Sequence, residues 1–200
     1  MTAYNAIRYN NAYENVGNLI LLSTQTASAS ASINFTSGIN STYKEYIFYF
    51  NNIHPDTRAK NFTFNMSVDT GSNYNVTKTT TYWGAYHKPT NDADYGGPGY
   101  AASNDLAQST AYQILGQNVS DANEGSLSGY LHLFEPSSTT FVKHFVSNTS
   151  FQQKSGGGAV YQVNRYIAGY GNTTSAVDAI GFKMSSDNID AGTIQMFGVI

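Results

Sequence analysis

The stretch HLFEPSSTTFVKHF, at residues 132–145, brings four chemically capable side chains close together in the sequence. They are His132, Glu135, Lys143 and His144. An imidazole or a carboxylate can act as a general acid or base, and imidazoles also bind metal ions. The stretch is therefore either the edge of an active site or a β-hairpin whose polar side chains lie on a sheet surface.

The turn residues in this stretch favour the hairpin. A turn at residues 136–139 sets His132 opposite Lys143 and Leu131 opposite His144. Because neighbouring residues of a strand point to opposite faces, this register places the two histidines on opposite faces, where they cannot share a metal ion or a proton. A turn of another length changes the register. The other expected cross-strand pairs are Glu135–Thr140, Phe134–Phe141 and Tyr130–Phe145.

The remaining sequence offers no catalytic motif. His54 stands before Pro55, and His87 stands before Lys88 and Pro89, which are positions typical of a strand end. The chain has no HxH or HExxH spacing, no G-x-S-x-G elbow and no phosphate-binding loop. Cysteine is absent, which excludes disulfides, thiolate metal ligands and a cysteine nucleophile. We predict that the protein is not an enzyme, with no catalytic residue, no cofactor and no metal.

Two close pairs of carboxylates allow an alternative to this prediction. Asp92 and Asp94 lie in one pair, and Asp187 and Asp190 in the other. Either pair could hold Ca²⁺ together with loop carbonyls, but neither shows the DxDxDG pattern, and tight turns commonly contain Asp and Asn. A glycosidase needs two carboxylates across a sugar-binding cleft, and the chain has only four Glu. We interpret both pairs as turn residues.

The composition indicates sheets and argues against several partners. Aromatic residues make up 14% of the chain and charged residues 12%, which suits pleated sheets better than helices. A formal net charge of −3 and scattered Lys and Arg provide no basic footprint, so we expect no nucleic-acid partner. The apolar run LILL at 19–22 is too short to cross a bilayer, and residues 1–17 do not resemble a secretory signal. We expect synthesis in the cytoplasm and no membrane partner.

A two-residue period runs through the sequence from residue 18. In NFTFNMSVD, at 61–69, apolar and polar residues alternate, as in a strand with one buried face. The stretch around Tyr46 to Phe50 has aromatics on both faces, which indicates a strand that is central in the sheet or is covered by another layer or by a second subunit. Tyr49 is therefore a candidate subunit-interface residue. We predict an all-β fold, an antiparallel β-sandwich of jelly-roll type with about eleven short strands, in one domain at 18–200. The other expected strands are 18–23, 29–35, 76–86, 110–118, 126–134, 141–149, 159–168, 176–184 and 192–199, with a long exposed loop at 88–105 and a hairpin tip at 152–159.

Two groups of aromatic residues are candidate contact sites. Residues 1–17 are an N-terminal arm, either frayed or docked on a neighbouring subunit through its tyrosines, because Tyr gives large contact area at a small entropy cost. Trp83, with Tyr82 and Tyr86 nearby, is either a platform for glycan stacking or a tryptophan of the core or of a subunit interface, and we favour the second reading. The arm tyrosines are Tyr4, Tyr9 and Tyr13. The Asn-x-Ser/Thr sequons, which include Asn34, Asn61, Asn75 and Asn148, are expected by chance in this composition.

Three stretches carry a family resemblance: residues 21–53, residues 129–145 and residues 167–199. They begin with LLSTQTASAS, GYLHLFEPSS and IAGYGNTTSA. They resemble small virion structural proteins of marine bacteriophages, of the cyanophage and pelagiphage type. The resemblance implies a virion component that is assembled in the host bacterial cytoplasm, and it transfers no active-site residue.

From the resemblance and the composition together we expect a capsid decoration (cement) protein. Its partners are copies of itself, as a homotrimer, and the major capsid protein or other virion proteins. Interface cores are enriched in Tyr and depleted in Lys, Glu and Asp, as this chain is. The alternative is a receptor-binding adhesin of a tail or head fibre that recognises host glycan. A glycan depolymerase is the least favoured, because no acid, base and nucleophile can be assembled.

Overall fold

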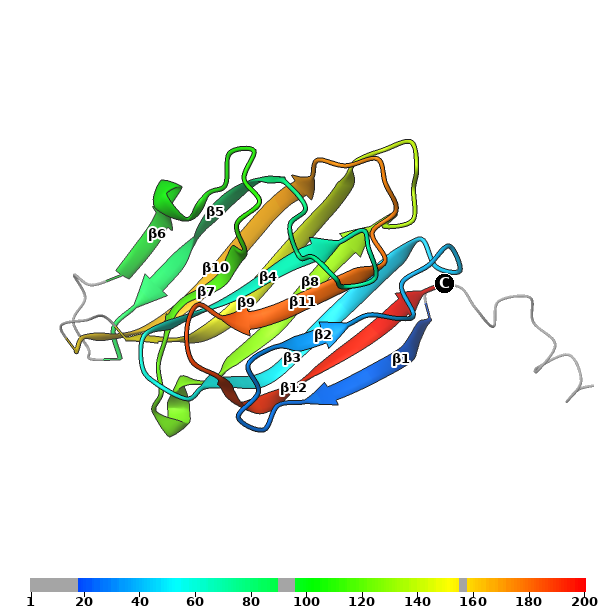
Figure 1. The fold of residues 1–200 in the computed structure, drawn as a ribbon. Coiled ribbons are helices and arrows are strands. Elements are labelled where there is room, and N and C mark those ends of the chain that lie inside the picture. The colour runs from blue at the N-terminus through cyan, green and yellow to red at the C-terminus, as the bar shows by residue number, and fades with distance from the viewer. Residues whose placement is uncertain (1–17, 90–95, 155–157) are drawn as a thin grey trace, which may run out of the picture.

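The computed structural model describes residues 18–89, 96–154 and 158–200, and these residues form an antiparallel all-β fold (Figure 1). It has twelve strands and two short 3₁₀ helices, η1 (Ala102–Asn104) and η2 (Asn123–Gly125). The strands are β1 (Leu19–Thr26), β2 (Ile33–Phe35), β3 (Glu45–Pro55), β4 (Lys60–Ser67), β5 (Lys78–His87), β6 (Gly96–Tyr100), β7 (Gln113–Val119), β8 (Leu127–Phe134), β9 (Lys143–Lys154), β10 (Val160–Gly171), β11 (Ala179–Met184) and β12 (Ile189–Val199). The prediction of an antiparallel all-β protein is confirmed.

The strands form one nearly closed, barrel-like sheet and no clear sandwich. One run of neighbours is β1-β12-β3-β8-β9-β10-β5-β6, and the other is β7-β4-β11-β2, which lies across it in Figure 1. Strand β9 joins the two runs. It belongs to the first run, and near its C-terminal end Gln153 pairs with Val119 of β7. The finer prediction of a jelly-roll sandwich therefore does not describe this sheet. Side-chain periodicity gives the face of each residue but not the strand's neighbours, so it could not reveal the junction.

The space between the two runs is filled by aromatic and aliphatic side chains. The inner residues of β3, Tyr46, Phe48 and Phe50, are fully buried, as the period of two predicts. Opposite them lies Phe182 of β11, which packs against rings from several strands. Most of the apolar area that leaves water on folding is in this core, and hydrophobic burial is the main favourable term in stability.

Strand β6 corrects the prediction of one long loop at 88–105. Residues Gly96–Tyr100 form a strand paired with β5, and Pro98 lies opposite Ala85. The glycine and proline content hid this strand, because both residues normally signal turns. Proline is nevertheless tolerated on an edge strand, where its missing N–H faces no partner, and within the described residues β6 pairs only with β5.

The hairpin at 132–145 forms, but its predicted register is wrong. His132 lies opposite Val146 and Leu133 opposite Phe145, three positions from the predicted pairing. The connection occupies residues 135–142 rather than a tight turn at 136–139. Because the shift is odd, His132 and His144 lie on the same face of the sheet and not on opposite faces. None of the predicted cross-strand pairs of this hairpin is found.

Lys143 holds this wide connection. Its Nζ donates hydrogen bonds to the carbonyl oxygens of Ser138 at 2.5 Å, Phe141 at 2.7 Å and Thr173 at 3.2 Å. The backbone N–H of Glu135 donates to the carbonyl of Lys44 at 2.6 Å, so the chain leaving β8 follows β3 instead of turning at once. A lysine on the inner face of the sheet therefore stabilises the longer connection. The turn residues of the sequence do not predict this effect.

The substitution Lys143→Met is expected to lower the free energy of unfolding by about 1–3 kcal/mol, because three carbonyls lose a charged donor. Urea unfolding followed by circular dichroism measures the loss. The matched control is Lys44→Met, which removes an exposed lysine whose ion pair with Glu135 is 3.3 Å long and changes stability by about 0.5 kcal/mol or less. Equal stabilities of the two variants would contradict the role given to Lys143.

Candidate functional site

The outer face of the longer run of strands carries a row of aromatic side chains. Cross-strand pairing places Tyr100 of β6 opposite Trp83 of β5, and Trp83 opposite Tyr166 of β10. The same line continues through Asn148 of β9 to β8 and β3. We call the aromatic members the outer aromatic row: Tyr49, Tyr130, Tyr166, Trp83 and Tyr100. The row crosses the sheet perpendicular to its strands because the register aligns these residues one by one.

Two pairs of rings in the outer aromatic row contact each other, and the row remains partly open to solvent. Trp83 stacks on Tyr166 with ring centroids 4.8 Å apart and planes at 17°, and Tyr49 meets Tyr130 edge to face at 6.3 Å. Trp83 is 47% exposed, Tyr166 44% and Tyr100 63%. Single exposed aromatics are ordinary on a protein surface, whereas a contiguous exposed apolar patch marks an interaction site.

The outer face is also hollowed beside this row. A shallow depression of about 460 Å³ lies over β5, β9 and β10 and is lined by Thr79, Thr81, His144, Val146 and Tyr170, among others. His144 packs against the ring of Tyr170, with centroids 5.8 Å apart. The lining is uncharged apart from any proton on His144. The row and the hollow together make an uneven surface of mostly neutral side chains.

The three aromatics proposed for glycan contact do not lie together. Trp83 is on the outer face, but Tyr82 is fully buried on the inner face, where it presents no ring to a ligand. Burial raises the pKa of Tyr82 to about 12, against the opposing effect of the Arg165 charge. Tyr86 follows the inner phase of β5 and is partly exposed near the end of the strand. Because successive residues of a strand point to opposite faces of the sheet, Tyr82 and Trp83 are adjacent in the sequence but lie on different faces.

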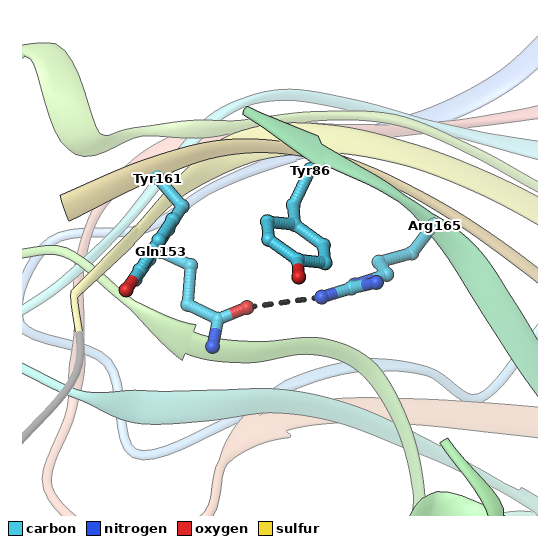
Figure 2. A pocket seen from close by; sticks show the side chains of 4 residues that line it. All are labelled: Tyr86, Gln153, Tyr161 and Arg165. Carbon is cyan, nitrogen blue, oxygen red and sulfur yellow. Dashed lines mark hydrogen bonds between the residues drawn. The ribbon is translucent and has the colours of Figure 1, made fainter. Parts of the chain in front are cut away.

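An inner pocket surrounds Tyr86 at that end of the sheet. It has a volume of about 240 Å³ and is lined by Tyr86, Gln153, Tyr161 and Arg165, from β5, β9 and β10 (Figure 2). Nη2 of Arg165 donates a hydrogen bond to Oε1 of Gln153 at 3.2 Å. Figure 2 shows the hydroxyl of Tyr86 directed toward this hydrogen bond. The pocket gathers several polar groups around one cation.

Sequence reasoning did not select Arg165, Gln153 or Tyr161. A signal for the arginine was present in the stretch VNRYI, because Arg165 shares its strand phase with Val163 and Ile167, both of which are buried. A charged residue in the apolar phase of a strand is unusual and indicates either a buried ion pair or a binding function. The pairing of Gln153 and Tyr161 across β9 and β10 depends on register, which the sequence does not give.

The histidines and the hairpin carboxylate each have separate partners. Nε2 of His132 lies 2.8 Å from Oε2 of Glu45, and Glu135 pairs with Lys44. His54 lies near the carbonyl of Ala122 at 3.2 Å and near Oδ2 of Asp190 at 3.8 Å. His132 and His144 thus share a face without sharing a partner, and no acid–base pair forms between them.

The described part of the chain brings no metal cluster together. It contains no group of three or more His, Asp and Glu side chains that could hold a metal ion. Oδ2 of Asp187 accepts hydrogen bonds from Thr57 at 2.7 Å and from Lys60 at 2.9 Å, and these bonds hold the pKa of its carboxyl below the usual value. Asp92 and Asp94, and the arm tyrosines Tyr4, Tyr9 and Tyr13, lie outside the described residues.

Known proteins add no assignment to these two surfaces. Comparisons with protein-family models, with curated proteins and with solved structures found no match for this chain. In the described ranges, no helix has the length and apolar character needed to cross a membrane. The candidate sites are therefore defined by geometry: the outer aromatic row and the inner pocket.

Proposed function

We propose that this protein is a structural subunit of a bacteriophage virion, a capsid decoration protein that associates with copies of itself through the outer aromatic row. The observation that carries the proposal is the line of partly exposed rings across the sheet, which Asn148 divides into Tyr100, Trp83 and Tyr166 on one side and Tyr130 and Tyr49 on the other. Exposed patches of this kind are covered when a protein assembles, and Trp and Tyr are prominent among residues that dominate binding energy. The resemblance of three stretches to virion proteins supports the same role.

The charge distribution along the row suits a surface that is covered on assembly. Two uncharged residues complete the line of cross-strand neighbours. Asn148 of β9 lies between Tyr166 and Tyr130, and Gln195 of β12 lies next to Tyr49 at the end of the row. Burying neutral side chains costs less than burying charges, which must be paired to be tolerated. The hollow lined by Val146 and Tyr170 can receive a side chain from a neighbour. Many modest contacts of this type add across a lattice.

The finer parts of the proposal concern the number of subunits and their place on the particle. A homotrimer bound to the major capsid protein remains our expectation, with the arm at 1–17 docking on a neighbour. Quantitative mass spectrometry of particles tests the place: hundreds of copies fit a shell component, and a dozen or fewer fit a tail or fibre.

The row itself is tested by self-association. Because Trp83 is the chain's single tryptophan and lies within the row, its fluorescence emission is expected to shift to the blue as protein concentration rises. Sedimentation velocity should show a defined oligomer in the same range. Trp83→Ser and Tyr166→Ser should each weaken association about 30-fold, as expected for a hot-spot residue worth about 2 kcal/mol.

The control variant is Phe141→Ser, which removes a ring that is 71% exposed but lies in the 135–142 connection, away from the row. It should leave the association constant unchanged. A wild-type protein that stays monomeric, both alone and with particles, would overturn the proposal. If that monomer instead bound a glycan array and lost binding in Trp83→Ser, the adhesin would replace the decoration protein, because exposed stacked rings also suit sugars.

A further inference from the structure

We propose that the inner pocket beside Arg165 binds the carboxylate of a small ligand of sugar-acid size, such as a hexuronate. This inference concerns the inner face of the sheet and does not depend on the outer aromatic row. It starts from the arginine, because the guanidinium is a permanent charge placed where charges are normally avoided.

Arg165 is a buried cation without a carboxylate partner in the described residues. It is only 7% exposed, and none of the ion pairs within the described ranges involves it. Its Nε has no hydrogen-bond partner, and Nη2 bonds to a neutral amide, that of Gln153. The guanidinium carbon lies 5.7 Å from the ring centroid of Tyr82, a contact that offsets little of the cost of burying a charge. The missing counter-charge points to an anionic ligand.

The pocket next to this cation has the size and lining of a small-molecule site. Its volume of about 240 Å³ is below that of pockets for drug-sized ligands and suits a single small ring. The rings of Tyr86 and Tyr161 meet at 88° with centroids 5.7 Å apart, so they offer an aromatic wall, and their hydroxyls offer hydrogen bonds. A sugar ring has matching features, with C–H groups on its faces and hydroxyls on its rim.

The charge of the lining favours a carboxylate over a phosphate monoester or inorganic sulfate, each of which carries about two negative charges. Arg165 is the only charged residue among the four that line the pocket. One guanidinium neutralises one carboxylate, with two parallel hydrogen bonds in the best geometry, whereas a dianion would remain half-compensated. A buried second cation, which a phosphate site would need, is not part of the lining. We therefore assign a monoanion carried on a small polar ring.

Glucuronate is the probe, and the full-length protein is titrated with it by ligand-observed NMR and by thermal unfolding. We expect binding in the range of about 1 mM and a higher melting temperature with ligand, since a ligand that binds only the folded state stabilises it. Glucose, which lacks the carboxylate, should not bind. Acetate, which lacks the ring, should bind more weakly than glucuronate. Acetate binding as tight as that of glucuronate would overturn the assignment of a sugar-sized ligand.

Variants separate the site from general effects on the fold. Arg165→Gln replaces the buried cation by a shorter, neutral amide and should weaken glucuronate binding about 10- to 100-fold. Tyr86→Phe keeps the ring, removes one hydroxyl and should weaken binding a few fold, which keeps the test valid if Arg165→Gln unfolds. The control is Arg58→Gln, at an exposed arginine, which should bind as the wild type does.

The chain's own carboxylates are tested in the same way. Asp92 and Asp94 lie outside the described residues, so the double variant Asp92→Asn/Asp94→Asn is titrated as well and should bind glucuronate at least as tightly as the wild type. Absence of binding up to about 50 mM in both proteins would overturn the inference. Binding that Arg165→Gln and Tyr86→Phe both leave unchanged, or binding of acidic peptides alone, would also overturn it. Arg165→Gln should self-associate normally, so failure here is distinct from failure of the outer aromatic row.

Discussion

Replacing Phe182 by alanine is expected to lower the free energy of unfolding by about 3–5 kcal/mol, the usual loss for deletion of a buried aromatic ring. Phe182 is fully buried on β11, and its ring meets rings from three other strands. The centroid distances are 5.3 Å to Phe50, 5.6 Å to Phe48, 6.0 Å to Phe62, 6.3 Å to Phe35 and 6.4 Å to Phe64. These rings come from both runs of strands, so a cavity here loosens the contact between them.

Urea unfolding followed by circular dichroism measures this loss. The control is Phe141→Ala, which deletes the same side chain from an exposed loop and should change stability by about 0.5 kcal/mol or less. A loss below about 1 kcal/mol in Phe182→Ala would mean that the surrounding rings collapse into the space, and it would contradict a core centred on this residue.

The free energy of unfolding is expected to rise by up to about 3 kcal/mol between pH 7 and pH 9.5, because of Lys78. This lysine is fully buried on β5, and burial lowers its pKa from 10.5 to about 7. In the unfolded chain it stays protonated until about pH 10.4. Between these values the unfolded state binds more protons than the folded state, so stability increases with pH. Below about pH 7 the full cost of burying the ammonium remains.

The variant Lys78→Met isolates this effect. It should flatten the rise. At pH 7 the gain from removing a buried charge that has no counter-charge is opposed by the loss of the hydrogen bond that Nζ donates to the carbonyl of Val76 at 2.7 Å. Asn65 Oδ1, which accepts from Lys78, keeps a second donor in the Met66 N–H at 2.8 Å. Measurements stop at pH 9.5 because burial raises the pKa values of Tyr46, Tyr74 and Tyr112, whose ionisation would favour unfolding above about pH 10.

Two comparisons complete the design. Lys44→Met, at an exposed lysine, should keep the wild-type rise. Lys143 also has a pKa lowered by burial, so a smaller slope is expected to remain in Lys78→Met. An unchanged wild-type slope in Lys78→Met would contradict the assignment.

The sequence predicts the strands better than their neighbours. Alternation at 61–68 located β4 (Lys60–Ser67) and its buried Phe62 and Phe64 almost to the residue, because the period of two is a local property. The expected solvent face of this strand was wrong, because Thr63, Asn65 and Ser67 are buried as well. The register of β8 and β9 failed because Lys143, through three carbonyls, fixes a longer connection than the turn residues suggest. Contacts between residues distant in the sequence decided that outcome, and a single sequence does not reveal them.

The candidate sites follow the same division. Trp83 was singled out from the sequence, and at 47% exposed it is not a core tryptophan. Its partners Tyr166 and Tyr100 are set by strand pairing. Tyr82, adjacent in sequence, belongs to the core instead. Arg165 could have been noticed from its place in an apolar phase, whereas the gathering of Gln153 and Tyr161 around it could not. The sequence could therefore indicate individual unusual residues, but it could not indicate which residues lie together in a site.

The position of β12 has a consequence for how the molecule is made. This strand follows all the others in the chain, yet it lies between β1 and β3, with Leu19 opposite Val199. During synthesis, β1 therefore lacks its ladder of hydrogen bonds until β12 has emerged from the ribosome. The ladder between β1 and β12 can therefore close only after β12 has been synthesised, and deletion of β12 would remove the strand with which β1 pairs.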